Sequence, residues 1–244
     1  GQEVVFICGS DTHGTPITVK AEAEGGTPLE IIKEYHKHFL EFFPRMGIRF
    51  TNYGSTDHPL NHSRTIQIMD DLRENGHVYA NDLKLPYCPN CDRFLPDRYQ
   101  KGTCPHCGAS ARGDECDQGC GRYLEPGELI DTRCGICRTK PEKRETRHYF
   151  LKLTTFEGFL TEYLQGLDGT EIARNYAKKW VEGGLKDWNI TRNLDWGIKV
   201  PGEPGLVYYV WVDAPIGYIA STEEWAERTG GNWKYYWKGE GSLI

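Results

Sequence analysis

Long apolar runs are missing from this sequence of 244 residues: no stretch approaches the ~20 residues that a helix needs to cross a bilayer. The first residues also lack the charged and then apolar pattern of a secretory signal. The net charge of −6 excludes a basic coat of the kind that wraps nucleic acid. Two phosphate-binding motifs are absent as well, the GxxxxGK(S/T) loop and a complete GxGxxG after a strand. We therefore expect a cytoplasmic globular protein that has no membrane partner and uses neither of these loops.

Cysteine is almost absent outside one short window. Only Cys8 of the nine cysteines lies outside residues 88–137. The other eight form four close pairs: Cys88 and Cys91, Cys104 and Cys107, Cys116 and Cys120, and Cys134 and Cys137. In a reducing compartment, such pairs are metal ligands more often than disulfides. Because two pairs supply four thiolates to one ion and leave no position for water, the eight cysteines predict two structural Zn²⁺ sites.

The spacing of the cysteines leaves their partners open. Sequential pairing would join 88/91 to 104/107 and 116/120 to 134/137, whereas nested pairing would join 104/107 to 116/120 and 88/91 to 134/137. An iron–sulfur cluster would fit the spacing too. The three residues between Cys116 and Cys120 depart from the usual two, so one of these thiolates is expected to bind less ideally.

Three regions differ in composition and predict an α/β domain interrupted by an insertion. Residues 1–80 read as a strand, a loop and two helices, with a capping box at Thr27 and Glu30 that opens the first helix. Residues 81–147 are rich in Gly, Pro, Cys and charge, so this insertion needs metal in place of a core. Residues 148–244 return to helical periodicity, followed by LVYYVWVDAP, which reads as a strand that turns into a helix near Asp213.

Two segments carry candidate site residues. The loop GSDTHGTP follows the apolar strand VVFIC, and ligands of open α/β sheets bind at such strand ends. Asp11 and His13 are therefore candidates, although they could instead simply close a tight turn. In VWVDAPIGY, four residues share one helical face: Trp211, Ala214, Pro215 and Tyr218. They could line a pocket, although periodicity alone favours an aromatic core.

A third segment, residues 138–152, is locally basic, with six Lys/Arg against two Glu. It could face phosphate groups or form a solvated loop, and the sequence does not separate the two.

Several segments resemble the catalytic region of the methionyl-tRNA synthetases, which are class I aminoacyl-tRNA synthetases. They are FICGSDTHGTPI, FLPDRYQKGTCPHC, YLEPGELI, RHYFLKL, DWNITR and, above all, YYVWVDAPIGY. The resemblance spans nearly the whole chain and implies a Rossmann-type parallel sheet interrupted by a zinc-binding connective insertion. It implies a reaction in which methionine and ATP, with Mg²⁺, give methionyl-adenylate, whose methionyl group then passes to tRNA(Met).

The resemblance also assigns roles to single residues. Trp211, Ala214, Pro215 and Tyr218 correspond to the pocket for the methionine side chain, where a thioether packs well on aromatic rings. Asp11 corresponds to the carboxylate that holds the substrate ammonium, Arg192 to the arginine beside it, and His13 to a support of the loop. The resemblance also bears on the cysteines, since relatives with a single zinc keep cysteines that match either the inner or the outer set. This implies nested pairing, with 104/107/116/120 as the inner set and 88/91/134/137 as the outer set.

Two class I signatures, an HIGH-type motif and a KMSKS-type loop, occur nowhere in the sequence. Both contact ATP in the family, so the resemblance implies a fragment that is inactive alone and belongs to an active whole. The alternatives are another class I synthetase and a zinc-ribbon module that binds nucleic acid without catalysis. Synthetases for branched amino acids insert a much longer editing domain, and a zinc ribbon does not account for YYVWVDAPIGY.

Overall fold

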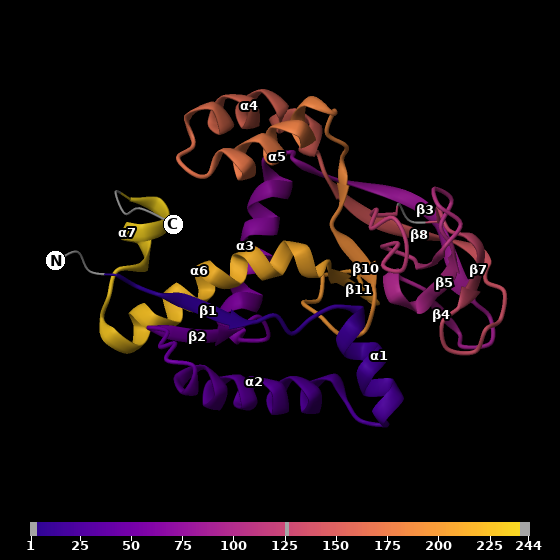
Figure 1. Ribbon diagram of the computed structural model, residues 1–244, viewed down its shortest axis with the longest axis horizontal. Coiled ribbons are helices and arrows are strands. Elements are labelled where there is room, and N and C mark those ends of the chain that lie inside the picture. Colours follow the sequence, from indigo (N-terminus) through magenta and orange to yellow (C-terminus); the bar gives the residue numbers. More distant parts are fainter. Residues whose placement is uncertain (1–3, 125–126, 240–244) are drawn as a thin grey trace.

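A short parallel sheet between helices forms the first half of the protein. The computed structural model describes residues 4–124 and 127–239, so Glu125 and Pro126 of the segment YLEPGELI lie outside the described residues. Strands β1 (Ile7–Ser10) and β2 (Asn52–Ser55) pair in parallel. Helix α2 (Pro28–Arg45) lies on one side of them and α6 (Val210–Thr229) on the other (Figure 1). This arrangement confirms the predicted α/β class.

Helix α2 begins where the sequence predicts it. The Thr27 hydroxyl accepts a hydrogen bond from the Glu30 N–H at 3.3 Å, and the Glu30 carboxylate accepts one from the Thr27 N–H at 2.8 Å. This reciprocal capping satisfies two backbone donors that the first turn leaves free. On the sheet side, Phe43 packs on Tyr53 of β2, with ring centroids 5.4 Å apart.

The main hydrophobic core lies on the other side of the sheet, around α6. It joins α3 (Pro59–Glu74), α6 and β11 (Leu206–Tyr208) with Ile190, Ile198 and Val200. Ile190 directly precedes β10 (Thr191–Asn193), which pairs antiparallel with β11. Val212 and Ile216 of α6 are buried in it. The predicted strand over LVYYVWV is shorter than expected, because the helix already begins at Val210.

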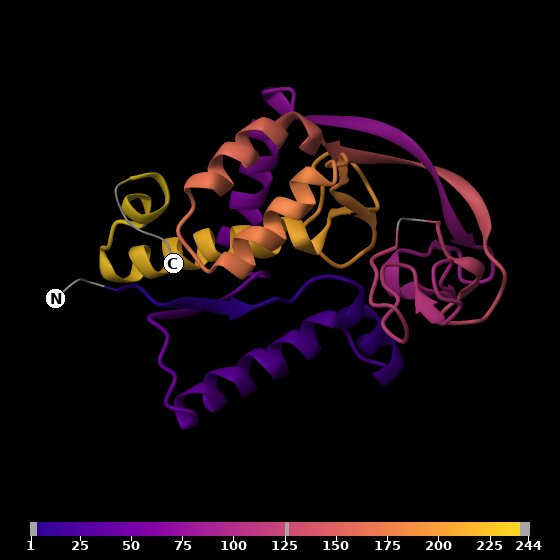
Figure 2. The ribbon, with the colours of Figure 1, turned by 45° about the horizontal axis from the view of Figure 1, so that its top comes forward.

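A curved two-stranded arm carries the cysteine-rich module away from this core (Figure 2). Strand β3 (Val78–Cys88) pairs antiparallel with β8 (Glu142–Leu151), and β4 (Arg93–Phe94) and β9 (Trp188–Asn189) flank them. The pairing of β3 with β8 crosses both ends of the insertion that composition predicts, at 80/81 and at 147/148.

The described arginines on β8 are engaged within the arm. Arg147 donates to the Asp82 carboxylate at 2.9 Å, and Arg144 donates to Glu142 and lies 3.5 Å from the Tyr87 ring centroid. For these two side chains the structure favours a role within the arm over an open phosphate-binding patch.

The remaining elements complete the module and the periphery. The module holds the turn η1 (Asp97–Tyr99) and the sheet of β5 (Gln100–Thr103), β6 (Ser110–Arg112) and β7 (Ile130–Cys134). Outside it lie α1 (Thr15–Glu24), the turn η2 (Leu153–Phe156), α4 (Glu157–Gly166), α5 (Glu171–Glu182) and α7 (Trp233–Lys238). None of the helices in the described residues is long and apolar enough to cross a membrane.

Candidate functional site

A cavity of about 230 Å³ opens where β1, β2 and α6 meet. The last residues of each parallel strand, the residue that follows each strand and one face of α6 line it. This is the position at which open α/β sheets bind ligands.

Glycines make room for this cavity. Gly9 and Gly54 face each other across the strand pair, and Gly217 lies opposite them on α6. A Cβ on Gly54 would lie 2.7 Å from the Ser221 hydroxyl, and one on Gly217 would lie 3.1 Å from a Thr56 methyl carbon. Larger residues at these positions would therefore push α6 away from the sheet and change the cavity.

The cavity has an apolar wall and a polar end. The wall is the helical face predicted from the sequence: Trp211, Ala214, Pro215 and Tyr218. Trp211 is 58% and Tyr218 52% exposed, so neither is part of a closed aromatic core. Asp11 lies among the other lining residues, and part of the residue is exposed.

His13 does not line the cavity but lies buried behind its polar end. Its Nδ1 is hydrogen-bonded to Asp213, and its Nε2 lies 3.5 Å from the Asp57 carboxylate. The intervening Thr12 is held by the Thr56 hydroxyl, which accepts from its N–H at 2.9 Å, and by Trp196, whose indole donates to its carbonyl at 2.8 Å. The loop that carries Asp11 is thus fixed by three different segments of the chain.

Electrostatics make this end of the cavity negative. Burial, and then repulsion from Asp213, raise the pKa of Asp11 to about 6, and the charge of His13 and a hydrogen bond from its backbone oppose this rise. Burial opposes a charge on His13, but its bonds to Asp213 and Asp57 prevail and raise its pKa to about 9. Burial raises the pKa of Asp213 too, although its bond with His13 opposes this. One imidazolium therefore faces the carboxyl groups of Asp11, Asp57 and Asp213, and their surplus over the single positive charge suits a cationic group.

The ligand atoms of His13, Asp57 and His62 lie within 4.8 Å of one another, which is close enough for a metal ion. A metal at His13 would have to displace a proton that two carboxylates hold in place. We therefore assign no metal to this group.

Arg192 does not line the cavity that Asp11 lines. It is one of the lining residues of a second, larger hollow of about 940 Å³ between the arm, the module and α5, and Trp211 lines both hollows. Its guanidinium donates to the Asp97 carboxylate at 3.2 Å and lies 3.8 Å from the Tyr209 ring centroid. Arg192 thus ties η1 of the module to β10 of the core.

The bond between Arg192 and Asp97 is expected to stabilise the module on the core. A double-mutant cycle with Arg192→Lys and Asp97→Asn should give a coupling energy of about 1 to 2 kcal/mol in thermal unfolding, because both side chains are largely buried. The Arg147–Asp82 pair is the matched control: its side chains are 61% and 44% exposed, so its coupling should stay below ~0.5 kcal/mol. Equal couplings in the two pairs would contradict this role.

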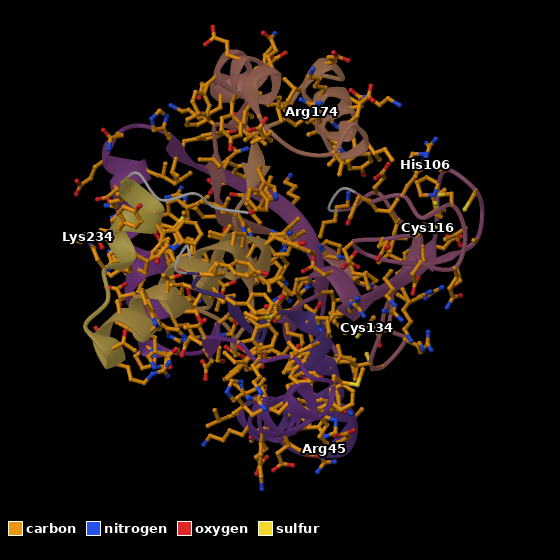
Figure 3. All side chains as sticks on the ribbon, turned by 60° about the vertical axis from the view of Figure 1, so that its left-hand side comes forward. Arg45, His106, Cys116, Cys134, Arg174 and Lys234 are labelled. Atoms are coloured by element: carbon orange, nitrogen blue, oxygen red, sulfur yellow. The ribbon has the colours of Figure 1, made fainter. Side chains whose placement is uncertain are left out.

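The eight cysteines of the module gather into two nested sets. Cys88, Cys91, Cys134 and Cys137 form the outer set, and Cys104, Cys107, Cys116 and Cys120 form the inner set. The nearest sulfur pairs are 3.4 and 3.8 Å apart in the outer set and 3.5 and 3.8 Å in the inner set. Four thiolates at ~2.3 Å from a Zn²⁺ ion stand about 3.8 Å from one another, so both sets fit a tetrahedral metal site. Figure 3 labels one cysteine of each set, Cys116 and Cys134.

The chemistry of the thiols fits a cation as well. Hydrogen bonds with Thr139 lower the pKa of Cys137 to about 5, and a bond from the Ala109 backbone lowers the pKa of Cys107 to about 6. Burial, and then the neighbouring thiols, raise the pKa of Cys91 to about 12. Without a metal, some thiols of a set therefore favour the thiolate and others the protonated form. A bound metal ion makes them alike, because it deprotonates every coordinating thiol.

The irregular spacing in the inner set is accommodated by Gly119. Cys120 still reaches Cys104, with the sulfurs 3.8 Å apart. A Cβ on Gly119 would lie 2.7 Å from the Cys107 sulfur and 3.0 Å from the Cys116 sulfur.

Gly119→Ala should therefore distort the inner set and reduce its zinc affinity about tenfold or more, in the range seen when the surroundings of metal ligands are disturbed. Competition with a chromophoric chelator measures this affinity, and the outer set should be unaffected. Gly158→Ala is the control, because a Cβ there meets nothing within 4 Å. An unchanged affinity in Gly119→Ala would show that the inner loop tolerates a side chain beside its sulfurs.

Comparisons with known proteins identify the family. Residues 1–244 match the family model described as tRNA synthetases class I (M). The chain belongs to this family. Its sequence is 60% identical over 244 residues to the methionine–tRNA ligase of Methanococcoides burtonii and 57% identical to that of Methanothrix thermoacetophila. The chain spans only 36% of the length of each of these relatives.

Solved structures share the fold of this class I synthetase chain. The crystal structure of Mycobacterium tuberculosis methionyl-tRNA synthetase bound by methionyl-adenylate superposes with a TM-score of 0.67 at 21% identity, over 98% of this chain and 43% of that one. A second structure of the same enzyme with methionyl-adenylate gives 0.65 at 22% identity. The predicted fold, a class I synthetase domain with a cysteine-rich insertion, is confirmed.

Some residues of the site were missed by the sequence analysis. Asp213 lies inside the quoted motif YYVWVDAPIGY, but its burial against His13 comes from the fold. Asp57 and Thr56 follow β2 as Asp11 and Thr12 follow β1, so the rule that polar residues after parallel strands meet at one edge could have found them.

Proposed function

We propose that this chain is part of a methionine–tRNA ligase and that its cavity binds methionine. The observation that carries the proposal is the pairing of an aromatic wall, formed by Trp211 and Tyr218, with the carboxylate of Asp11 at one end of a small cavity. The wall suits a thioether, which packs favourably on aromatic rings. The carboxylate, in a negative surrounding, suits the substrate ammonium.

In the proposed reaction the carboxylate oxygen of methionine attacks the α-phosphorus of ATP, and pyrophosphate leaves. A ribose hydroxyl at the end of tRNA(Met) then takes the methionyl group, and AMP leaves. The residues of this chain contribute by binding and orienting methionine, which converts an encounter into a positioned reaction. The HIGH-type and KMSKS-type motifs that would hold ATP with Mg²⁺ do not occur in this sequence. Since the chain spans 36% of the length of its relatives, the proposal gives these motifs to the rest of a longer protein that acts in the cytoplasm.

The two cysteine sets are proposed to hold one structural Zn²⁺ each. With four thiolates around each ion, no position remains for water or substrate, so the metal would supply fold stability and no step of the reaction.

Methionine-dependent exchange of pyrophosphate into ATP tests the proposal in the full-length protein. Methionine should support exchange. Leucine, isoleucine and valine should support it at least ~100-fold less well, because their branched side chains do not match the shape of the cavity. Trp211→Ala should raise the KM for methionine about tenfold or more while leaving the KM for ATP within about twofold. Trp180→Ala is a matched control, since Trp180 is 56% exposed and lines only the larger hollow. Equal losses for methionine and ATP in Trp211→Ala would show that Trp211 serves the fold alone.

A further inference from the structure

A buried pair of opposite charges lies directly behind the polar end of the cavity. The side chains of His13 and Asp213 are 2% and 1% exposed, and they come from positions 200 residues apart. The second carboxylate oxygen of Asp213 is buried and has no hydrogen-bond partner among the residues the structure describes. His13 is therefore the side chain that compensates the buried charge of Asp213.

This pair joins the polar end of the cavity to its apolar wall. His13 follows Asp11 by two residues, and Asp213 stands between Trp211 and Ala214 on α6. The Trp196 indole meets the His13 ring edge-on, with centroids 5.7 Å apart, and so covers the pair from a further segment. A change in either charged side chain would reach both the Asp11 loop and the aromatic wall.

We propose that His13 and Asp213 are positioning residues for the amino-acid substrate. His13, as an imidazolium held by Asp213, fixes the loop of Asp11 and balances its charge, so that Asp11 is a carboxylate when the substrate ammonium arrives. This inference rests on the proposed function, which gives Asp11 the ammonium.

Four charged or titratable groups face His13: Asp11 on the same loop, Asp57 after β2, His62 of α3 and Asp213 of α6. Burial raises the pKa of Asp213, and the hydrogen bond and positive charge of His13 oppose this rise and favour its carboxylate form. Burial, and then the charge of His13, lower the pKa of His62, which favours its neutral form at neutral pH. Burial opposes a charge on Asp57, but its bond with His13 prevails and lowers its pKa. His13 is thus the one positive side chain of the group.

The two charges act on Asp11 in opposite directions. Asp213 raises the pKa of Asp11, and His13 lowers it. An ammonium binds the carboxylate form, so methionine affinity should fall as the pH drops through about 6, where Asp11 becomes protonated. We call this fall in affinity on the acid side of the pH curve the acid limb. Neutralising His13 should move the acid limb to higher pH, and neutralising Asp213 should move it to lower pH.

The dissociation constant for methionine, measured by calorimetry from pH 5 to pH 8 on the full-length protein, tests the inference. In His13→Asn, an amide N–H can still face Asp213, and the limb should move up by about half a unit to one unit. In Asp213→Asn it should move down by a similar amount. A purely structural role would weaken binding at all pH values without opposite shifts, and limbs that stay in place or move together would overturn the inference.

Two controls separate the possible failures. A carboxylic acid with the methionine side chain but no amino group should show no such limb, and exposed His38→Asn on α2 should leave the limb in place. If the unaltered protein binds no methionine at any pH, the proposed function fails, whereas binding with unmoved limbs defeats only this inference.

NMR titration of the His13 ring in the unaltered protein needs no variant: a ring that is protonated at pH 7 supports the inference, and a neutral ring overturns it.

Discussion

Asp11→Asn is expected to reduce methionine-dependent pyrophosphate exchange in the full-length protein by about 30- to 1,000-fold. Truncating one partner of a hydrogen-bonded charge pair costs about 2 to 4 kcal/mol, which corresponds to that range. Most of the loss should fall on the KM for methionine, because the ammonium is bound in the ground state as well as in the transition state.

Asp195→Asn is a suitable control for this loss, since the Asp195 carboxylate lies outside the residues that line the cavity. The amino-group-free analogue of methionine offers a second test, because its affinity should be the same in the Asp11→Asn protein and the unaltered one. An Asp11→Asn protein that keeps full exchange activity would show that the ammonium binds elsewhere.

Loss of the outer metal set is expected to have the second largest effect. Cys134→Ser should remove one zinc per chain and unfold the part of the module around the outer set, because a structural zinc site contributes on the order of 10 kcal/mol to its domain. The core beneath this set cannot compensate, since among the described residues it buries only Leu95 and Tyr99 apart from its cysteines, with Leu194 partly buried against them. Cleavage by protease within residues 89–140 and the zinc content of the purified protein would measure the loss.

The inner set is the matched comparison. Cys107→Ser should also remove one zinc, but it should leave the outer set and the Arg192–Asp97 bond in place. We therefore expect Cys134→Ser to lower exchange activity more than Cys107→Ser does. Two zincs retained in either variant would contradict the assignment of its four ligands.

Local signals predicted the elements that depend on neighbouring residues. The capping box of Thr27 and Glu30 opens α2, and the close cysteine pairs come together in two metal-like sets. The capping box depends on residues within one turn, so its spacing is sufficient. The spacing of the cysteines predicts pairs of metal ligands, but it leaves open which pairs share an ion, because that depends on how β3 and β7 come together.

Contacts between distant segments could not be predicted in this way. No periodicity links His13 to Asp213 or Arg192 to Asp97, because each bond depends on how α6 and the arm pack. The start of α6 is a related case: Val210, Trp211 and Val212 favour strands by intrinsic preference, but burial of Val212 in the core makes them helical. Tertiary packing overrides the local preference there.

A crystal of the full-length protein soaked with selenomethionine tests the central claim most directly, because anomalous scattering locates the selenium without a model of the ligand. We predict a selenium peak in contact with Trp211, Pro215 and Tyr218, with the amino group of the same ligand within hydrogen-bond distance of Asp11. A selenium peak in the larger hollow beside Arg192, or a ligand whose amino group faces away from Asp11, would contradict the account.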